Sequence, residues 1–395
     1  MKAPQGADVI SLGCRLNIAE SEQIRALLAD ESDVVVVNSC AVTSAAVRQT
    51  RQAIRQARKA RPDARLLVTG CAADIERDAF AAMAEVDGLV ANIAKLDPRA
   101  WNVPPKPLSI RSEKHTRAFI AVQNGCDHAC TFCVIPQGRG ASRSLNVAQV
   151  LRKVEDHLAL GAQEVVLTGV DVTSWGHDLP GSPKLGELVR RVLDTFPHLA
   201  RLRMSSLDGI EVDGELFDLF AQHPRVMPHI HLSLQHGDDL ILKRMKRRHS
   251  RADAVELVTR LKAFRAEIAI GADLIAGFPT ETCEHHAANL SIIEDLEIVH
   301  GHIFPYSPRP GTPAARMPQV DGATIRARAA ELRASVASVR NRWLQQQVSK
   351  PQVILAEADG CGYSASYARV AAPAGTPTGS IVTVIPTKLE QGLLA

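Results

Sequence analysis

Short apolar runs alternate with helix-spaced apolar positions over the first hundred residues. The four valines at residues 34–37 form a continuous run of the kind that is buried on both faces of a sheet. Similar elements flank this run, with strands expected at 9–12 and 66–68 and helices at 18–29 and 43–59. Alternating strands and helices indicate a parallel sheet, so residues 1–105 are predicted to form an α/β domain.

The same alternation repeats six times in the central part of the chain. Strands are expected at 118–123, 164–168, 202–205, 231–234, 268–275 and 301–304. Helices are expected at 147–160, 185–196, 214–222, 252–265 and 284–296. Six such units predict a partial (β/α)6 TIM-like barrel over residues 112–341, with its active site at the carboxyl ends of the strands. Proline-rich residues 98–108 are expected to be the linker before it.

The pattern changes again after a helix expected at 324–347. Short alternating segments, separated by glycine and proline turns, are expected as strands at 352–356, 363–370 and 380–385. They predict a small β-barrel over residues 342–395.

Composition narrows the class of protein only slightly. The chain has 395 residues, 46% of them apolar, and a net charge of +3 that does not by itself indicate a nucleic-acid partner. Its apolar runs are too short to span a bilayer, and no apolar signal core precedes Cys14. We therefore expect a cytoplasmic protein with no membrane partner. In that reducing compartment, eight cysteines favour metal or redox chemistry over disulfides.

Three of these cysteines form a compact motif. Cys126, Cys130 and Cys133 have C-x3-C-x2-C spacing. Three thiolates can hold three irons of a [4Fe-4S] cube and leave the fourth iron open. An open iron can bind S-adenosylmethionine (SAM) and pass an electron to its sulfonium. This loop is therefore the expected catalytic centre.

A second trio is dispersed along the chain. Cys14, Cys40 and Cys71 each follow the end of a predicted strand. Such ends share one edge of a parallel sheet, where ligands bind, so we expect the three thiols to converge on a second metal site. For any one of them, a small buried apolar cysteine is the alternative. Zinc is the competing metal, although it would require a fourth ligand.

Other strand ends and two basic segments provide further candidates. Small and polar residues at the barrel strand ends are candidates for binding SAM, namely Thr168, Gly169, Ser205, Ser206 and Gln235. Basic residues in the helix at 43–59 and in the run at 242–249 are candidates for binding RNA, namely Arg48, Arg51, Arg55, Lys243, Arg244, Arg247 and Arg248. Each basic segment is otherwise typical of a solvated helix face.

The motifs together resemble a known family. Residues 125–136 read Gly-Cys-Asp-x-x-Cys-Thr-Phe-Cys-x-Ile-Pro, which is similar to the cluster loop of radical SAM enzymes. The settings of Cys14, Cys40 and Cys71 resemble the auxiliary-cluster domain of the methylthiotransferases, so the resemblance covers nearly the whole chain. The motifs at residues 167–171, 232–235 and 304–312 look most like the MtaB-type branch.

This resemblance implies a tRNA-modifying enzyme with two [4Fe-4S] clusters. The cluster at Cys126, Cys130 and Cys133 would reduce SAM to a 5′-deoxyadenosyl radical that takes hydrogen from carbon 2 of an adenine. The cluster at Cys14, Cys40 and Cys71 would carry a sulfur methylated by a second SAM. The implied substrate is N6-threonylcarbamoyladenosine at position 37, in the anticodon loop of tRNA. An electron donor and a sulfur source are also implied, as is an RNA-binding, TRAM-like role for the C-terminal barrel.

Alternatives remain at this stage. The same chemistry on N6-isopentenyladenosine-37 of tRNA or on a ribosomal-protein aspartate is one, and a non-catalytic zinc-binding RNA module is another. His128 is expected to be a surface loop histidine and Cys283 an incidental thiol. Neither His236 nor Cys361 suggests a role.

Overall fold

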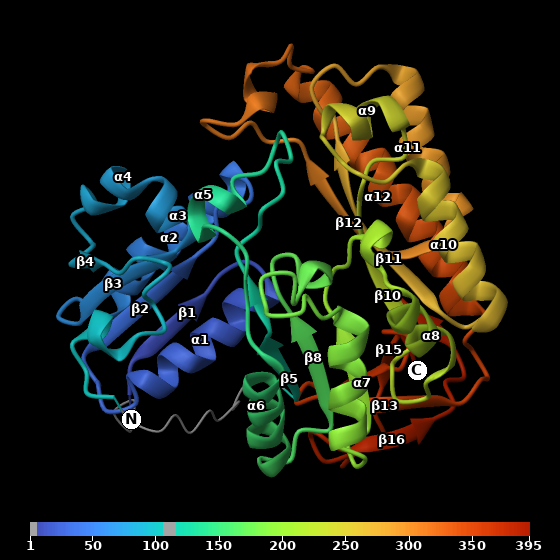
Figure 1. Ribbon diagram of the computed structural model, residues 1–395, viewed down its shortest axis with the longest axis horizontal. Helices are drawn as coiled ribbons and strands as arrows, with labels where there is room; N and C mark the ends of the chain where they lie inside the picture. The colour runs from blue at the N-terminus through green and yellow to red at the C-terminus, as the bar shows by residue number, and fades with distance from the viewer. Residues whose placement is uncertain (1–5, 106–115) are drawn as a thin grey trace.

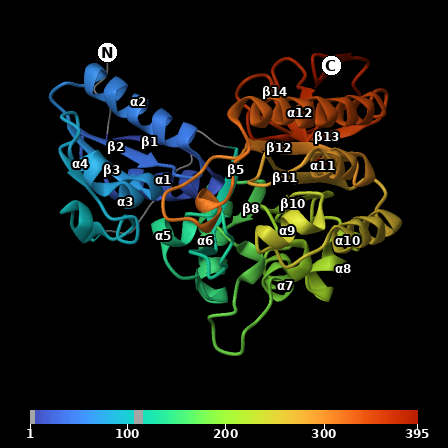
Figure 2. The ribbon, with the colours of Figure 1, turned by 90° about the horizontal axis from the view of Figure 1, so that it is seen from above.

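A computed structural model describes residues 6–105 and 116–395 of the chain (Figures 1 and 2). Part of the predicted linker at 98–108 and the predicted boundary between residues 105 and 112 lie outside the described residues. Within the described part, the linker begins with a short 3-10 helix, Pro98–Trp101, whose Trp101 ring is buried against the N-terminal sheet.

The N-terminal region is a parallel sheet with helical crossovers, as predicted. Its strands run side by side in the order β1 (Asp8–Ser11), β2 (Val34–Ser39), β3 (Arg65–Gly70) and β4 (Gly88–Leu89). Every residue of β2 is buried, as expected for the four-valine run. The crossovers contain α1 (Arg15–Leu27), α2 (Ser44–Ala60), α3 (Cys71–Ile75) and α4 (Arg77–Ala81). Helix α2 begins where the hydroxyl of Thr43 accepts a hydrogen bond from the Ala46 N–H at 3.1 Å.

The central region is a partial barrel made of two parallel half-sheets. One half contains β5 (Arg117–Ala121), β8 (Glu164–Thr168) and β9 (Arg201–Met204), and the other contains β10 (His229–Gln235), β11 (Ala269–Ala276) and β12 (Ile298–Pro305). Parallel bridges from Leu202 to Val226 and from Leu207 to Leu232 join the halves. The outer face is covered by α6 (Val147–Ala159), α7 (Leu185–Thr195), α8 (Gly214–Gln222), α10 (Arg251–Phe264), α11 (Cys283–Asp295) and α12 (Gly322–Gln345). The predicted six strand–helix units are confirmed.

Strand periodicity divides the barrel wall into two chemically different faces. Alternate residues such as Leu232 on β10 and Leu274 on β11 lie in the large apolar core beneath the outer helices. Because successive strand residues point to opposite faces, their neighbours point into the concave side. Those neighbours include His231 and Asp273. The concave face is therefore polar, and it is the face that carries the site.

The N-terminal region packs against the barrel at two places. Helix α1 contacts β5, with Ala19 against Phe119 and Val166. The loop after β12 also reaches the N-terminal region (Figure 2). Its Arg309 pairs there with Glu76 at 3.0 Å.

The C-terminal region is a small, mainly antiparallel sheet. Its strands lie in the order β16 (Ile381–Val384), β13 (Gln352–Ala356), β14 (Cys361–Ser364), β15 (Arg369–Ala371), β18 (Leu393–Leu394) and β17 (Leu389–Glu390). The single strand predicted at 363–370 is wrong, because it is a hairpin of β14 and β15. Tyr367 at its tip has φ 65° and stacks on the Arg203 guanidinium of the barrel, 3.8 Å from carbon to ring centroid. This tertiary contact takes Tyr367 out of the strand.

A buried ionic cluster joins the N-terminal region to the segment that follows the cysteine loop. The Glu20 carboxylate on α1 forms ion pairs with Arg139 of α5 (Ile135–Arg139) at 2.9 Å and with Lys95 at 2.6 Å. All three side chains are at most 3% exposed. Burial alone raises the pKa of Glu20, but Lys95 and Arg139 outweigh that effect and the net shift is downward.

Replacing Glu20 by Ala should destabilise the protein strongly, because it leaves two buried cations without their carboxylate. We expect a loss of about 3–5 kcal/mol in the free energy of unfolding, measured by urea denaturation. Arg48→Ala, at an exposed position of α2, is the matched surface control and should leave the unfolding midpoint nearly unchanged. A Glu20→Ala midpoint equal to that of the control would show that the cluster contributes nothing to stability.

Candidate functional site

The loop that carries Cys126, Cys130 and Cys133 is fixed by its own hairpin and by distant loops. It follows β6 (Gln123–Asn124), which pairs with β7 (Arg143–Ser144). Gly125 begins it with φ 76°, and a Cβ there would lie 1.9 Å from the Ala141 carbonyl oxygen. Only glycine therefore allows the hairpin to close. The Thr131 N–H donates to the Met245 carbonyl at 3.1 Å, which fastens the loop to the end of α9 (Asp239–Arg244).

Each thiol of this loop has a nitrogen donor close to its sulfur. The His128 and Ile135 N–H groups donate to the Sγ atoms of Cys126 and Cys133, both at 3.4 Å. The Arg247 guanidinium lies 3.7 Å from the Cys130 Sγ. Such donors stabilise thiolates and, when a cluster is bound, raise its reduction potential. The donor set therefore fits thiolate ligands of an iron-sulfur cluster.

Burial keeps the thiols of Cys126 and Cys133 from ionising without a metal. It raises the pKa of Cys126 to about 12 and that of Cys133 to about 11. A nucleophilic cysteine instead needs a lowered pKa. A bound metal ion deprotonates a coordinating thiol outright. The loop is accordingly suited to ligation rather than to nucleophilic attack.

The second trio also meets at one edge, as expected. Cys40 and Cys71 are buried directly after β2 and β3, and Cys14 caps the start of α1. Gly13 has φ 97°, and a Cβ there would lie only 2.7 Å from the Cys40 Cβ. Burial, opposed by the Val42 N–H and aided by the nearby thiols of Cys14 and Cys71, raises the pKa of Cys40 to about 11. The chain thus brings these three sequence-distant thiols together.

The two trios face each other across a short contact between α3 and α5. A Cβ on Gly138 would lie 3.1 Å from the Cys71 Cβ, so the two helices touch. The Asn92 amide donates to the Gly138 carbonyl at 2.5 Å and lies 3.7 Å from the Cys71 Sγ. Two ligand sets this close can serve one reaction.

The spacing of the thiols disfavours a single zinc ion. In tetrahedral zinc sites the ligand sulfurs stand about 3.8 Å apart, given Zn–S bonds near 2.3 Å. Among residues 6–105 and 116–395, neither cysteine trio is a group whose three ligand atoms all lie within 4.8 Å of one another. The thiolates of a four-iron cube bind different irons and stand farther apart. Neither trio therefore has the spacing of a tetrahedral zinc site.

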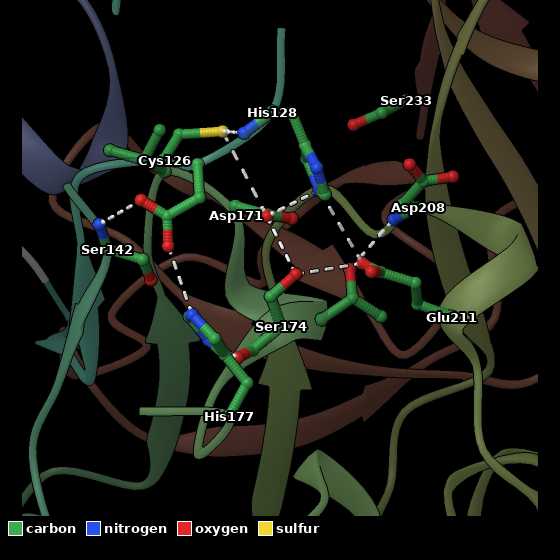
Figure 3. Close-up of polar contacts among 12 residues, drawn as sticks. Cys126, His128, Ser142, Asp171, Ser174, His177, Asp208, Glu211 and Ser233 are labelled. Carbon is green, nitrogen blue, oxygen red and sulfur yellow. Dashed lines mark hydrogen bonds and ion pairs between the residues drawn. The ribbon is translucent and has the colours of Figure 1, made fainter. Parts of the chain in front are cut away.

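Charged residues close the site beside Cys126 (Figure 3). His128, expected to be a surface loop histidine, is instead half-buried and paired with a carboxylate. Its ring lies 2.8 Å from an Asp171 carboxylate oxygen, and this hydrogen bond raises the pKa of His128. Ser174 donates to Asp171 at 2.7 Å and to Glu211 at 3.0 Å. The cluster loop is thereby tied to the ends of β8 and β9.

The sequence reasoning missed Asp208, which organises the other side. This buried carboxylate pairs with Arg247 at 3.0 Å and with Arg248 at 3.2 Å, and Figure 3 places it beside Glu211. Its place just after Ser205 and Ser206, at the end of a barrel strand, was the available signal. Burial alone would raise the pKa of Asp208, but the His249 side chain and the Arg247 and Arg248 guanidinium groups outweigh it and lower this pKa to about 2, so the carboxylate is ionised at neutral pH.

The predicted SAM candidates lie at the strand ends nearest the cysteine loop. Thr168 is buried, and Gly169 packs on Gln123, where a Cβ would lie 2.8 Å from the Gln123 Oε1. Ser206 is 2.8 Å from the Ser233 hydroxyl, and Gln235 ends β10 with φ 71°. The buried Ser205 hydroxyl has no hydrogen-bond partner among the described residues, which fits a polar ligand.

The basic candidates differ in exposure and in their ion pairs. Arg48, Arg55, Lys243 and Arg248 are exposed, and Arg55 lies 3.7 Å from Glu85. Arg51 pairs with Glu76 at 2.9 Å, Arg244 donates to Thr280 at 2.8 Å, and Arg248 bonds Glu211 at 2.7 Å. Arg247 is 8% exposed and bound to Asp208 and to the Ser233 carbonyl. The expectation of a surface RNA contact at Arg247 is wrong, because its buried guanidinium instead joins the cluster loop to the barrel wall.

Three residues without a functional role expected from the sequence, His236, Cys283 and Cys361, lie outside the two cysteine trios. His236 is fully buried and lies 3.1 Å from Glu281, and its other ring nitrogen accepts the Asp238 N–H. Cys283 is exposed at the start of α11, and Cys361 starts β14.

Comparison with known proteins gives the same architecture. Residues 120–290 match the family model of the radical SAM superfamily, and residues 7–91 match the uncharacterized protein family UPF0004. The tryptophan- and SAM-analogue-bound radical SAM methyltransferase TsrM from Kitasatospora setae superposes with a TM-score of 0.52 at 18% identity, covering 75% of this chain and 66% of that one. That likeness concerns the fold.

Two curated relatives extend over most of the chain. The threonylcarbamoyladenosine tRNA methylthiotransferase MtaB of Rickettsia prowazekii is 42% identical over 98% of this chain and 96% of its own length. A tRNA-2-methylthio-N(6)-dimethylallyladenosine synthase from Acidothermus cellulolyticus is 32% identical over 90% of this chain and 78% of its own length.

The chain therefore belongs to the radical SAM methylthiotransferase family, and it is an enzyme. Within that family it falls in the MtaB branch. Membership implies SAM and a [4Fe-4S] cluster, for which the Cys126 loop is the fitting site. None of the described helices is long and apolar enough to cross a membrane.

Gly125→Ala should abolish the cluster at the Cys126 loop, because the new Cβ overlaps the Ala141 carbonyl. We expect loss of bound iron and loss of reductive SAM cleavage, measured by iron analysis and by 5′-deoxyadenosine formation. Gly161→Ala is the control, since it has a similar positive φ of 88° but open space around the added Cβ. Each change carries a backbone cost of about 1–2 kcal/mol, so only the overlap differs between them. Equal iron contents in the two variants would contradict this reading of the loop.

Proposed function

We propose that this enzyme inserts a methylthio group at carbon 2 of N6-threonylcarbamoyladenosine at position 37 of tRNA. The observation that carries the proposal is the 42% identity to an MtaB enzyme over 98% of the chain. Two thiol trios that face each other across α3 and α5 agree with a reaction that needs both a radical and a sulfur carrier.

The proposal assigns a [4Fe-4S] cluster to each trio. Cys126, Cys130 and Cys133 would hold the one at which SAM binds, and Cys14, Cys40 and Cys71 the auxiliary one. Bound clusters and SAM supply the one-electron chemistry that removes hydrogen from an unactivated carbon and delivers sulfur to it. The protein's part is to hold the ligands: Ser205 offers its buried free hydroxyl, and Asp171 fixes His128 over the loop.

We also assign the candidate contacts to the tRNA anticodon loop. A loop nucleotide can splay out of its stack, so an enzyme can reach its base. Arg48, Arg55 and Lys243 are exposed, and Arg244 and Arg248 lie on the same segment as Lys243. Each phosphate contact should make binding weaken with added salt.

The domain division proposed is residues 1–105, 112–341 and 342–395. The first would carry the auxiliary cluster, the second the radical SAM barrel, and the third a TRAM-like RNA-binding module. The enzyme would act in the cytoplasm, where an electron donor and a sulfur source supply the electrons and sulfur that its own residues cannot.

Deleting the gene should remove 2-methylthio-N6-threonylcarbamoyladenosine from cellular tRNA and leave its unmethylthiolated precursor. Mass spectrometry of tRNA nucleosides measures both, and restoring the gene is the control. Persistence of the modified nucleoside, with no second enzyme present, would contradict the proposed substrate. Loss of 2-methylthio-N6-isopentenyladenosine or of a ribosomal-protein modification would instead indicate one of the other targets.

The two-cluster assignment predicts how iron divides between the trios. Purified enzyme should hold about eight irons, from two four-iron cubes. Changing Cys126, Cys130 and Cys133 to Ala should remove about half of this iron, and changing Cys14, Cys40 and Cys71 should remove the other half. Cys283→Ala and Cys361→Ala, outside both trios, should change nothing. Zinc in place of iron in the wild type would contradict the two-cluster assignment.

A further inference from the structure

The concave face of the barrel carries a polar group to which the reaction assigns no role. His231, Asp273 and His302 come from β10, β11 and β12. The His231 Nε2 and the His302 Nδ1 lie 3.0 and 3.1 Å from the same Asp273 oxygen, Oδ1. The Ser206 hydroxyl donates to the other Asp273 oxygen at 3.3 Å. This set is called the His–Asp–His group below.

The position of the group follows from strand periodicity. On β11, Ala272 and Leu274 lie in the core beneath the outer helices, so Asp273 between them points inward. Nearer the amino ends of the strands, His229 packs edge-on against Tyr367 of the C-terminal hairpin, with ring centroids 4.6 Å apart. The His–Asp–His group thus lies between the contact of His229 with Tyr367 and the carboxyl ends of the strands.

A continuous set of contacts connects the group to the cluster loop. Ser206 is 2.8 Å from the Ser233 hydroxyl. The Ser233 carbonyl accepts Arg247 at 2.8 Å, and the same guanidinium lies 3.7 Å from the Cys130 Sγ. The group is therefore a few side chains away from the place where the base must present its carbon 2.

Burial within the group is uneven in a way that suits a ligand. The His231 side chain is 8% exposed and that of Asp273 is 21% exposed, whereas His302 is 61% exposed. Because Nδ1 of His302 faces Asp273, its Nε2 is turned away from that carboxylate. This outward ring nitrogen can form a hydrogen bond with a polar group of a ligand.

We propose that the His–Asp–His group, with Ser206 and Ser233, is the subsite that receives the N6 substituent of the substrate adenosine. The inference rests on the proposed function and extends it to specificity. A threonylcarbamoyl group brings a carboxylate, a hydroxyl and an amide, which match a histidine donor, an aspartate and two serine hydroxyls. A dimethylallyl group brings none of these and would leave the outward His302 Nε2 without a ligand partner.

The size of this discrimination follows from general rules. A site built to hydrogen-bond its substrate rejects an analogue without those groups, because buried polar atoms are then left unsatisfied. One lost hydrogen bond to a charged group costs about 1.5–3 kcal/mol, or roughly 10- to 100-fold in affinity. His302 is the most exposed member, so replacing it removes the ligand contact with little risk to the fold.

The test compares binding of two anticodon stem-loop RNAs that differ only at position 37. Fluorescence anisotropy gives the dissociation constant of the cluster-loaded enzyme for the threonylcarbamoyl loop and for the unmodified adenosine loop. His302→Phe should weaken binding of the first by roughly 10-fold or more and leave the second unchanged. His302→Gln, which keeps a donor, should recover part of the loss. Iron content and SAM cleavage without RNA should match the wild type in both variants.

His198→Phe is the matched control, because His198 is exposed before β9 and outside the concave face. It should leave both dissociation constants unchanged. A wild-type enzyme that modifies the threonylcarbamoyl loop, together with a His302→Phe variant that keeps the wild-type ratio of affinities, would overturn the subsite alone. A wild-type enzyme that modifies only a dimethylallyl loop would overturn the proposed function as well. Detection of a further metal ion that His302→Phe releases would overturn the subsite, since the His–Asp–His group would then be a metal site.

Discussion

The arrangement of the two thiol trios depends on a single buried carboxylate. Glu20 projects from α1 and holds Arg139, at the end of α5, and Lys95, which also donates to Asn38 at the end of β2 at 3.1 Å. One trio follows the strand ends of the N-terminal sheet and the other directly precedes α5. A displacement of either helix would therefore separate the trios. Burying three charges has a high desolvation cost, and the resulting geometry is correspondingly specific.

The same ionic cluster suits the charge that the ligands acquire. Two cations against one carboxylate leave a net positive charge beside Cys71. Three thiolates and a cluster core carry net negative charge once assembled, and a nearby buried cation offsets it at short range in a low dielectric. At the other trio, Arg247 performs a similar task beside Cys130 while Asp208 holds the guanidinium in place. The protein thus places a buried, pinned cation next to each set of thiols.

Much of this architecture was readable from the sequence, because it depends on periodicity. In the N-terminal and central regions, valine runs and helical spacing located the predicted strands and helices to within three residues of their observed ends, and cysteines at strand ends had to share an edge. The failures depend on tertiary contacts. Residues 363–370 alternate like a strand, yet Tyr367 leaves the ladder to stack on Arg203. Arg247 belongs to a basic run typical of a surface, and only the position of Asp208 shows that it is buried.

The polar concave face is also a consequence of strand periodicity, although its meaning depends on the fold. Each strand must place alternate residues against the helices, and those residues are apolar here, as Leu232 and Ala272 are. The other residues are free to serve the ligand. On β10 to β12 they include histidines and an aspartate that hydrogen-bond one another across neighbouring strands. Relatives named for a threonylcarbamoyl and for a dimethylallyl adenosine both match this chain over most of its length, so the shared scaffold does not by itself select the substrate. The inward side chains are better suited to distinguish the substrates, because they can change without disturbing either the outer core or the cysteine loop.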